Sequence, residues 1–316
     1  MNLSVIICTW NRAELLDRTL TSMHELHIPD GISWELIVVN NNCTDNTDEV
    51  IQRHASKLPI LRILEETPGQ SHARNAALQA ATGELLIWTD DDVVVAPDWI
   101  AQYLKAVRDW PEAAYFGGTV DPIYESPPPT WMEPHLKDLG AMLAIHQYGN
   151  HVSKFPEHDI PRGVNMALPK KILEEFEFDT RLGNSENSNL RGEDADLLRR
   201  LQSAGHYGVW VGPARVQHWV PTERLTKEYI QTWYRGGGRS FTLRNGLAEC
   251  KWAFGYPRWV LKAFWISKLK AALTLPLRNK SWLSSFTRAA FLRGVLNQAK
   301  ESGKVSLVQI AKNSKQ

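Results

Sequence analysis

Residues 85–95, LLIWTDDDVVV, decide how the rest of this chain is interpreted. Four apolar residues from Leu85 to Trp88 stop at Thr89 and three consecutive carboxylates, and a second apolar run begins at Val93. A short apolar run with turn-forming neighbours predicts a buried strand. Three acids at the end of such a strand would repel one another in a low-dielectric setting unless a cation lies among them.

The three carboxylates, Asp90, Asp91 and Asp92, offer oxygen ligands of the kind that Mg²⁺ or Mn²⁺ prefers. In an extended segment, side chains at positions i and i+2 point the same way, so we expect Asp90 and Asp92 to face together and Asp91 to face away. This favours an Asp-x-Asp site for a divalent metal that holds a diphosphate. A solvated acidic turn would have the same sequence, and other parts of the chain must separate the two interpretations.

The composition indicates a globular protein of one large domain or two, because 316 residues with 43% hydrophobic content can bury a substantial core. Its three cysteines, Cys8, Cys43 and Cys250, lack metal-ligand spacing and are odd in number, which favours a reduced, cytosolic compartment. We identify no signal peptide, and no run of about 18 uncharged apolar residues predicts a membrane-spanning helix.

Charge is distributed unevenly along the chain. Residues 244–316 hold 14 Lys or Arg against 2 acids, a net charge of +12, which leaves −11 for residues 1–243 because the total is +1. Such a charge asymmetry between two parts of a chain predicts that the basic part binds an anionic partner, either a membrane surface or a nucleic acid.

Strand and helix patterns alternate in the first part of the chain. Strand patterns cover residues 3–9, 34–39, 61–65 and 85–88, and helical patterns cover residues 12–26, 44–51 and 69–81. This alternation predicts an α/β fold with a mostly parallel central sheet flanked by helices. Polar clusters follow three of the strands, and ligands bind beyond the carboxyl ends of such strands, so we expect the clusters to share one site. Dehydrogenase and phosphate-loop motifs are absent after the first strand.

The second half of the chain is less regular. Residues 121–149, rich in Pro, Trp and His, have no period and predict a mobile loop or lid. A helix is expected at residues 226–234, ended by the glycines at residues 236–238. Further strands are expected at residues 114–120, 162–168 and 207–211, and further helices at residues 97–110, at 170–176 and after Gly192.

Seven motifs, taken in order, resemble family 2 glycosyltransferases, which are inverting enzymes of the GT-A fold. They are SVIICTWNR (4–12), LIVVNNNCTDNT (36–47), GQSHARNAAL (69–78), ELLIWTDDDV (84–93), RGVNMAL (162–168), RGEDADLLRRL (191–201) and VQHWVPTERLT (216–226). The resemblance covers roughly residues 1–240. It implies a GT-A glycosyltransferase domain at residues 1–243, followed by a basic, Trp-rich, amphipathic helical extension at residues 244–316.

The resemblance also implies which residues bind the nucleotide of a sugar donor. Thr9, Asn11 and Arg12 would line the nucleotide pocket, and Arg74 would approach the base or the diphosphate. Asn41 stands where the family usually has an aspartate that reads the uracil ring. Asn both donates and accepts hydrogen bonds whereas Asp only accepts them, so this departure leaves the base open.

Other residues would bind the rest of the donor and the metal. Asp90 would contact the ribose, with Asp91 in the same donor site. Asp92 would bind Mg²⁺ or Mn²⁺, with Asp90 and His218 completing the metal and diphosphate site. The residues near the donor sugar would be Gly163 and Asn165.

Asp194 would be the general base, with Glu193 as the next candidate. An inverting transfer needs one base to take the proton of the acceptor hydroxyl while that oxygen attacks C1, and it needs positive charge to stabilise the departing diphosphate. A capping acid at a helix N-terminus is the simpler explanation of the same residues.

Apolar residues with Trp and interspersed Lys or Arg in the extension describe an amphipathic helix at a membrane interface, although the same helices could pack on the catalytic domain. We therefore expect a metal-dependent hexosyltransferase with a nucleotide-sugar donor, which the resemblance implies is UDP-linked, and a polysaccharide or glycolipid acceptor. It would lie in the cytoplasm, peripheral on the inner face of the cell membrane, with no nucleic-acid partner. The alternatives are a nucleotidyltransferase, or a non-enzymatic membrane- or RNA-binding protein on a degenerate catalytic fold.

Overall fold

The computed structural model describes residues 2–157, 159–185, 188–247 and 251–313, so Cys250 lies outside the described residues. The chain divides into two compact units. The first contains residues 1–125, 140–186 and 193–220, and the second contains residues 126–139, 187–192 and 221–316. The second unit therefore begins before residue 244, where the sequence predicted the extension to start, and it also takes two earlier segments of the chain.

A nine-stranded sheet forms the centre of the first unit within the described residues, in the order β3-β2-β1-β4-β8-β6-β11-β5, with β7 pairing β11. The strands are β1 (Asn2–Thr9), β2 (Ser33–Asn40), β3 (Ile60–Leu64), β4 (Leu85–Thr89), β5 (Val93–Val95), β6 (Tyr115–Tyr124), β7 (Val152–Lys154), β8 (Asn165–Pro169) and β11 (Gly208–Val220). The pairings from β3 to β4 are parallel, as predicted. The sheet is mixed overall, because β8 runs antiparallel to both β4 and β6.

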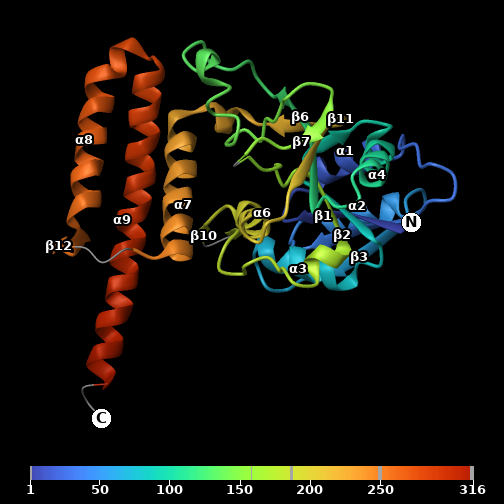
Figure 1. Cartoon of the computed structure of the whole chain (residues 1–316), viewed down its shortest axis with the longest axis horizontal. Helices are drawn as coiled ribbons and strands as arrows, with labels where there is room; N and C mark the ends of the chain where they lie inside the picture. The colour runs from blue at the N-terminus through green and yellow to red at the C-terminus, as the bar shows by residue number, and fades with distance from the viewer. Residues whose placement is uncertain (1, 158, 186–187, 248–250, 314–316) are drawn as a thin grey trace. The chain divides into compact units, whose positions relative to one another are not determined.

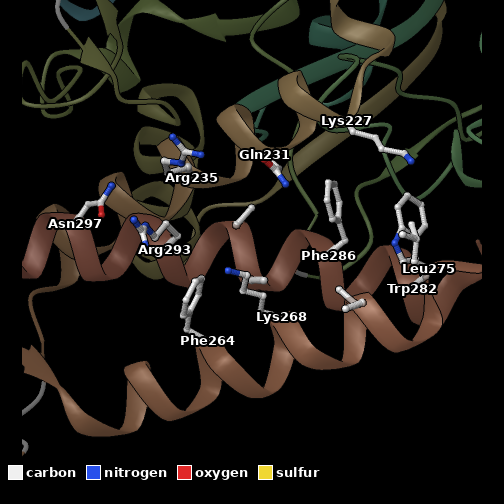
Figure 2. A pocket seen from close by; sticks show the side chains of 14 residues that line it. Lys227, Gln231, Arg235, Phe264, Lys268, Leu275, Trp282, Phe286, Arg293 and Asn297 are labelled. Carbon is white, nitrogen blue, oxygen red and sulfur yellow. The ribbon is translucent and has the colours of Figure 1, made fainter.

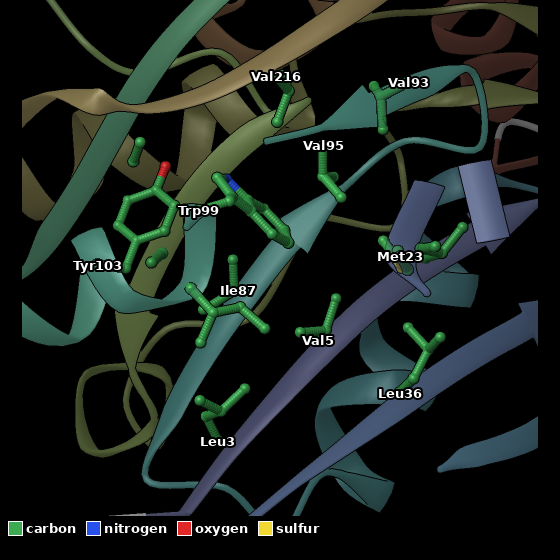
Figure 3. Packing of buried hydrophobic residues seen from close by; sticks show 14 of the residues in the cluster. Leu3, Val5, Met23, Leu36, Ile87, Val93, Val95, Trp99, Tyr103 and Val216 are labelled. Carbon is green, nitrogen blue, oxygen red and sulfur yellow. The ribbon is translucent and has the colours of Figure 1, made fainter. Parts of the chain in front are cut away.

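Helices cover both faces of this sheet. The unit contains α1 (Ala13–Met23), α2 (Thr47–His54), α3 (Gln70–Ala80), α4 (Trp99–Asp109), α5 (Lys170–Leu173) and α6 (Glu193–Ser203), together with the short strand β9 (Asn184–Ser185). Alternate residues of each strand join different clusters, since Val5 and Ile87 belong to one core and Ile6 and Leu86 to the other. Trp99 fills the first core, where Figure 3 shows it between the strands and α4.

The second unit is mainly helical. It contains η1 (Glu133–His135), β10 (Ser188–Asn189), η2 (Thr222–Leu225), α7 (Lys227–Asn245), β12 (Trp252–Ala253), β13 (Tyr256–Pro257), α8 (Arg258–Thr274), η3 (Leu275–Leu277) and α9 (Lys280–Asn313). Figure 1 shows α9 lying between α7 and α8. Within the described ranges, no helix combines the length and the apolar character that crossing a bilayer requires.

The glycine run at residues 236–238 does not end a helix, which corrects the sequence-based expectation. These residues lie inside α7, which continues to Asn245. A Cβ on Gly238 would collide with the backbone oxygen of Phe291 in α9, and a Cβ on Gly294 would collide with the backbone oxygen of Arg235. The two glycines therefore allow α7 and α9 to approach closely, and this packing outweighs the low helix propensity of glycine.

Residues 121–149 form mostly turns and loop, as predicted, and defined contacts hold parts of this segment. Val120 and His146 exchange two backbone hydrogen bonds of 2.9 and 3.0 Å, and β6 extends to Tyr124. Residues 126–139 belong to the second unit, where the Trp131 ring packs edge-on against Trp282 with centroids 5.8 Å apart. After Tyr124 the segment contains turns and the short helix η1, which are too short to give the sequence a helical or strand period.

Candidate active site

The three consecutive aspartates lie in a turn between β4 and β5, not in an extended segment. The expectation that Asp91 faces away from Asp92 is therefore wrong. One guanidinium nitrogen of Arg12 donates to Asp91 Oδ1 at 3.0 Å and to Asp92 Oδ2 at 3.1 Å. Asp90 instead approaches Arg74, with 3.8 Å between the carboxylate and the guanidinium. The turn therefore directs Asp91 and Asp92 towards Arg12, and Asp90 towards Arg74.

Residues at the end of β1 fix the position of Asp91. The Thr9 hydroxyl donates to Asp91 Oδ2 at 2.7 Å, and the α1 hydroxyl of Thr19 donates to the Asp91 carbonyl oxygen at 2.9 Å. Thr9 is the last residue of a buried strand, so its side chain is held rigidly. Arg12 follows it by three residues, and the predicted grouping of Thr9 and Arg12 with the aspartates is present in the structure.

This concentration of carboxylates shifts their protonation. Burial, together with the neighbouring Asp92 carboxylate, raises the pKa of Asp91 to about 6 against the lowering effect of the Arg12 guanidinium. Enclosure by the surrounding protein and the charge of Asp92 also raise the pKa of Asp90. The Arg12 pKa is raised mainly by the Asp91 carboxylate. An additional cation would make the ionised carboxylates more stable.

His218 reaches the same cluster from β11. Its Nε2 lies 3.5 Å from Asp92 Oδ1, and the two side chains are 2% and 3% exposed. The antiparallel pairing of His218 with Val93 fixes this approach, as does the 2.8 Å hydrogen bond from the Trp219 amide to the Asp92 carbonyl. Two donor atoms at this separation can serve as ligands of one divalent cation. Across the described residues, no three His, Cys, Asp or Glu side chains converge tightly enough to hold a metal by themselves.

Arg74 connects the aspartate turn to the acidic start of α6. It is buried within α3, and it pairs with Asp194 and lies 3.4 Å from Glu193 in addition to its contact with Asp90. The side chain of Asp194 is 20% exposed, whereas that of Glu193 is 6% exposed. Asp194 is therefore the more accessible of the two predicted bases.

Gly163 makes room for this carboxylate. A Cβ on Gly163 would collide with the Asp194 carboxylate. The structure thus brings Gly163 next to the candidate base. Any side chain at this position would push Asp194 away from Arg74.

Two further residues support Arg74 and were missed by the sequence analysis. The Phe178 ring lies under the guanidinium at 5.3 Å from its centroid. With its amide oriented to satisfy both neighbours, Gln70 accepts from Arg74 at 2.9 Å and donates to Glu193 at 3.2 Å. Gln70 precedes Arg74 by four residues, a helical spacing that could have revealed this pair.

Asn41 lies at the end of the neighbouring strand β2, but its side chain is engaged within the protein. Its amide nitrogen donates to the carbonyl oxygens of Glu65 and Thr67 at 3.0 and 2.8 Å, and its oxygen accepts from the Gly69 amide at 2.8 Å. An aspartate could not make the first two bonds. Asn41 therefore braces the loop that leads into α3, where the sequence suggested a contact to the base.

Asn11 occupies the loop after β1 with a φ of 51°, a left-handed conformation that asparagine tolerates. Its side-chain oxygen accepts from the Thr44 amide at 2.7 Å, so it joins the loops that follow β1 and β2. Asn11 and Arg12 are exposed, consistent with a place at the edge of a nucleotide site.

Asn165, which was expected near a donor sugar, has a fully buried side chain. Its oxygen accepts from Trp99 Nε1 at 2.8 Å and from the Tyr103 hydroxyl at 2.7 Å. Its nitrogen donates to the carbonyl oxygens of Thr119 and Ala214, both at 2.9 Å. Through these hydrogen bonds, Asn165 joins β8 to α4, β6 and β11.

Comparison with known proteins agrees with the motif pattern. The glycosyl transferase family 2 model matches residues 4–176. The succinoglycan biosynthesis protein ExoM of Rhizobium meliloti is 25% identical over 232 residues, covering 73% of this chain and 71% of ExoM. A glucosyl-dolichyl phosphate glucuronosyltransferase of Haloferax volcanii is 24% identical over 225 residues, covering 69% of each chain.

Solved structures with the same fold include several glycosyltransferases. The mannosyltransferase PcManGT of Pyrobaculum calidifontis, in complex with GDP-Man and Mn²⁺, superposes with a TM-score of 0.60 at 19% identity, covering 94% of this chain and 86% of its own. GalNAc-T7 with UDP, GalNAc and Mn²⁺ gives a TM-score of 0.56 at 17% identity, covering 78% of this chain and 52% of its own. These similarities establish the GT-A fold for the present chain.

Proposed function

The chain belongs to glycosyl transferase family 2 and is a glycosyltransferase, and from this we propose a specific reaction. It would move a hexose from a nucleoside diphosphate sugar to a hydroxyl of a polysaccharide or glycolipid, with inversion at the anomeric carbon. The observation that carries the proposal is the cluster in which Arg74 joins the aspartate turn to Asp194. A separate carboxylate is thereby placed beside the acidic group that would face the diphosphate.

Charge balance supports a divalent cation in this reaction. Five carboxylates and two guanidinium groups form the cluster: Asp90, Asp91, Asp92, Glu193 and Asp194 with Arg12 and Arg74. An anionic diphosphate would be repelled by such an excess of acids. The Asp92 and His218 donor atoms fit Mg²⁺ or Mn²⁺, which commonly take one or two protein ligands and complete their shell with substrate phosphates. When bound, the cation would neutralise charge on the departing diphosphate.

Asp194 would accept the proton of the acceptor hydroxyl. As that oxygen bonds to C1 of the sugar, the bond between C1 and the diphosphate oxygen breaks, and the diphosphate leaves with the electron pair. The guanidinium of Arg74 pairs with the Asp194 carboxylate and fixes its direction. The partial exposure of Asp194 lets an acceptor reach it, whereas Glu193 is enclosed.

We propose UDP as the nucleotide, with GDP as the competing choice. Solved relatives of the fold include the Staphylococcus aureus protein TarS in complex with UDP and the mannosyltransferase with GDP-Man. The Asn41 side chain forms its hydrogen bonds within the protein. Selection of the nucleotide base would therefore depend on the backbone of residues 65–69, which Asn41 holds in place.

Thermal denaturation with nucleotides tests this proposal. We expect UDP with Mn²⁺ to raise the melting temperature of the full chain, and we expect chelation of the metal to abolish the rise. A shift with GDP alone would reassign the base, and a shift only with nucleoside triphosphates would favour a nucleotidyltransferase instead. A screen of nucleotide sugars for metal-dependent release of the nucleotide would then identify the donor.

Membrane attachment would bring the enzyme to a lipid-linked or growing glycan. The helix α8 exposes Trp265, Leu269 and Leu273 to 56%, 62% and 72%, between basic residues such as Lys262 and Lys270. This is the pattern of a helix lying in the membrane interface. We propose peripheral binding at the inner face of the cell membrane, and sedimentation with anionic vesicles at low salt would test it. Absence of binding there would remove the membrane part of the proposal.

A further inference from the structure

Three helices of the second unit form a groove of about 610 Å³. Residues of α7, α8 and α9 line it, and on each helix they recur every three or four positions, so each helix contributes one face. Figure 2 shows Lys227 and Arg235 approaching from α7, with Lys268 on α8 and Arg293 on α9. The groove lies entirely within the second unit.

The groove is strongly cationic. Its described lining includes Lys227, Arg235, Lys268 and Arg293 and contains no carboxylate. In the part of the chain that the structure describes, no ion pair joins any of these four residues to an acid. Four like charges around one opening raise its electrostatic potential, and they are balanced best by an anionic ligand.

Apart from the amide side chains of Gln231 and Asn297, the remaining lining is apolar. The Arg293 guanidinium lies 5.7 Å from the Phe264 ring centroid, and the Lys227 ammonium lies 5.6 Å from that of Trp282. Phe286 and four alanines add to the apolar surface between these two ends. A groove that offers cations at its edges and aromatic and aliphatic carbon between them matches a ligand with an anionic head and a hydrocarbon chain.

The same helix α8 that forms one wall also carries the exposed Trp265, Leu269 and Leu273. A helix with such a face is suited to the membrane interface, where phosphorylated lipids are the abundant anionic amphiphiles. We propose that the groove binds a membrane lipid, with its phosphate held by Lys268 and Arg293 and its chain along the alanines and aromatic rings. This site goes beyond the transfer reaction, since it uses no residue of the active-site cluster.

Calorimetry on the full-length protein tests this site, with dodecyl phosphate below its micelle concentration as the probe. We expect saturable binding of dodecyl phosphate at one site, with an affinity about tenfold or more above those of inorganic phosphate and dodecyl maltoside. Only dodecyl phosphate can contact both the cationic and the apolar residues of the groove. The variant Lys268→Gln/Arg293→Gln should weaken dodecyl phosphate about tenfold or more, since it removes two charge-assisted hydrogen bonds.

The matched control is Lys262→Gln/Lys270→Gln, which removes two exposed charges of α8 that do not line the groove. It should leave dodecyl phosphate binding unchanged. Circular dichroism and the melting temperature check that both double variants remain folded. Equal binding of dodecyl maltoside would show an apolar pocket only, and equal binding of inorganic phosphate would show an anion site without a lipid. Either result, or equal loss in both double variants, would overturn the proposal.

Discussion

Replacing Asp194 with asparagine tests the assignment of the catalytic base most directly. The two side chains have the same shape, but an amide cannot take the proton of an acceptor hydroxyl. Removing a positioned general base lowers a reaction rate by about 10²- to 10⁴-fold. We expect the turnover of Asp194→Asn to fall within this range while binding of the nucleotide persists.

The structure also predicts that this variant folds. After the exchange, Arg74 keeps Glu193 at 3.4 Å and Asp90 at 3.8 Å, so its buried guanidinium still has two acidic neighbours. Weakening one charged partner under these conditions costs about 1–3 kcal/mol. A modest fall in melting temperature should therefore accompany a large loss of activity.

The assay compares transfer and binding in the same preparation. Nucleotide release from the donor is measured with and without acceptor, and calorimetry gives the affinity for the nucleoside diphosphate with Mn²⁺. Glu193→Gln is the matched control, since Glu193 contacts the same guanidinium but is only 6% exposed. Full transfer by Asp194→Asn would refute the assignment, and loss of transfer only in Glu193→Gln would make Glu193 the base.

Three further variants test other parts of the structure. Asn41→Asp removes two donors and places a carboxylate against two carbonyl oxygens, so thermal denaturation should show a loss of about 1–3 kcal/mol; an unchanged melting temperature would contradict the bracing role. Gly238→Ala should lower the melting temperature because its Cβ would meet the α9 backbone, whereas Gly237→Ala, whose Cβ lies 4.0 Å from the nearest atom, should not; equal effects would remove the close helix crossing as the cause. Burial lowers the pKa of His146, so the unfolded chain binds a proton more readily, and stability should fall between pH 7 and pH 5 by at most about 1.4 kcal/mol per pH unit from this residue. His146→Phe should lose less stability over that range in chemical denaturation, and an identical pH dependence would rule out this contribution.

The first half of the fold could be predicted from the sequence because patterns of neighbouring residues determine its strands and helices. Apolar runs such as residues 3–9 become central strands, and the spacing of Leu16 and Leu20 gives a helix face. The grouping of Thr9, Arg12 and the aspartates could also be predicted, since strand ends of parallel neighbours meet at one edge of a sheet.

Other features depend on tertiary contacts that sequence patterns do not contain. The glycines of α7 look like a helix end, and only the partner helix α9 explains them. The direction of each carboxylate at residues 90–92 depends on a turn that replaces strand alternation. The motif around Asn165 matches the family, but it does not contain the burial of this side chain among Trp99, Tyr103 and two carbonyl oxygens.

The assembly of the second unit from separate pieces of chain has a consequence for its synthesis. His135 lies 2.7 Å from the Arg278 carbonyl oxygen, although 143 residues separate them in the sequence. During translation, residues 126–139 would leave the ribosome long before the helices they pack on, and Trp131 would stay in water until then. Such non-local contacts form late and leave a nascent chain prone to aggregation. A shortened gene that stops after Val220 would make this exposure permanent, so a minimal catalytic fragment needs residues 126–139 redesigned as well.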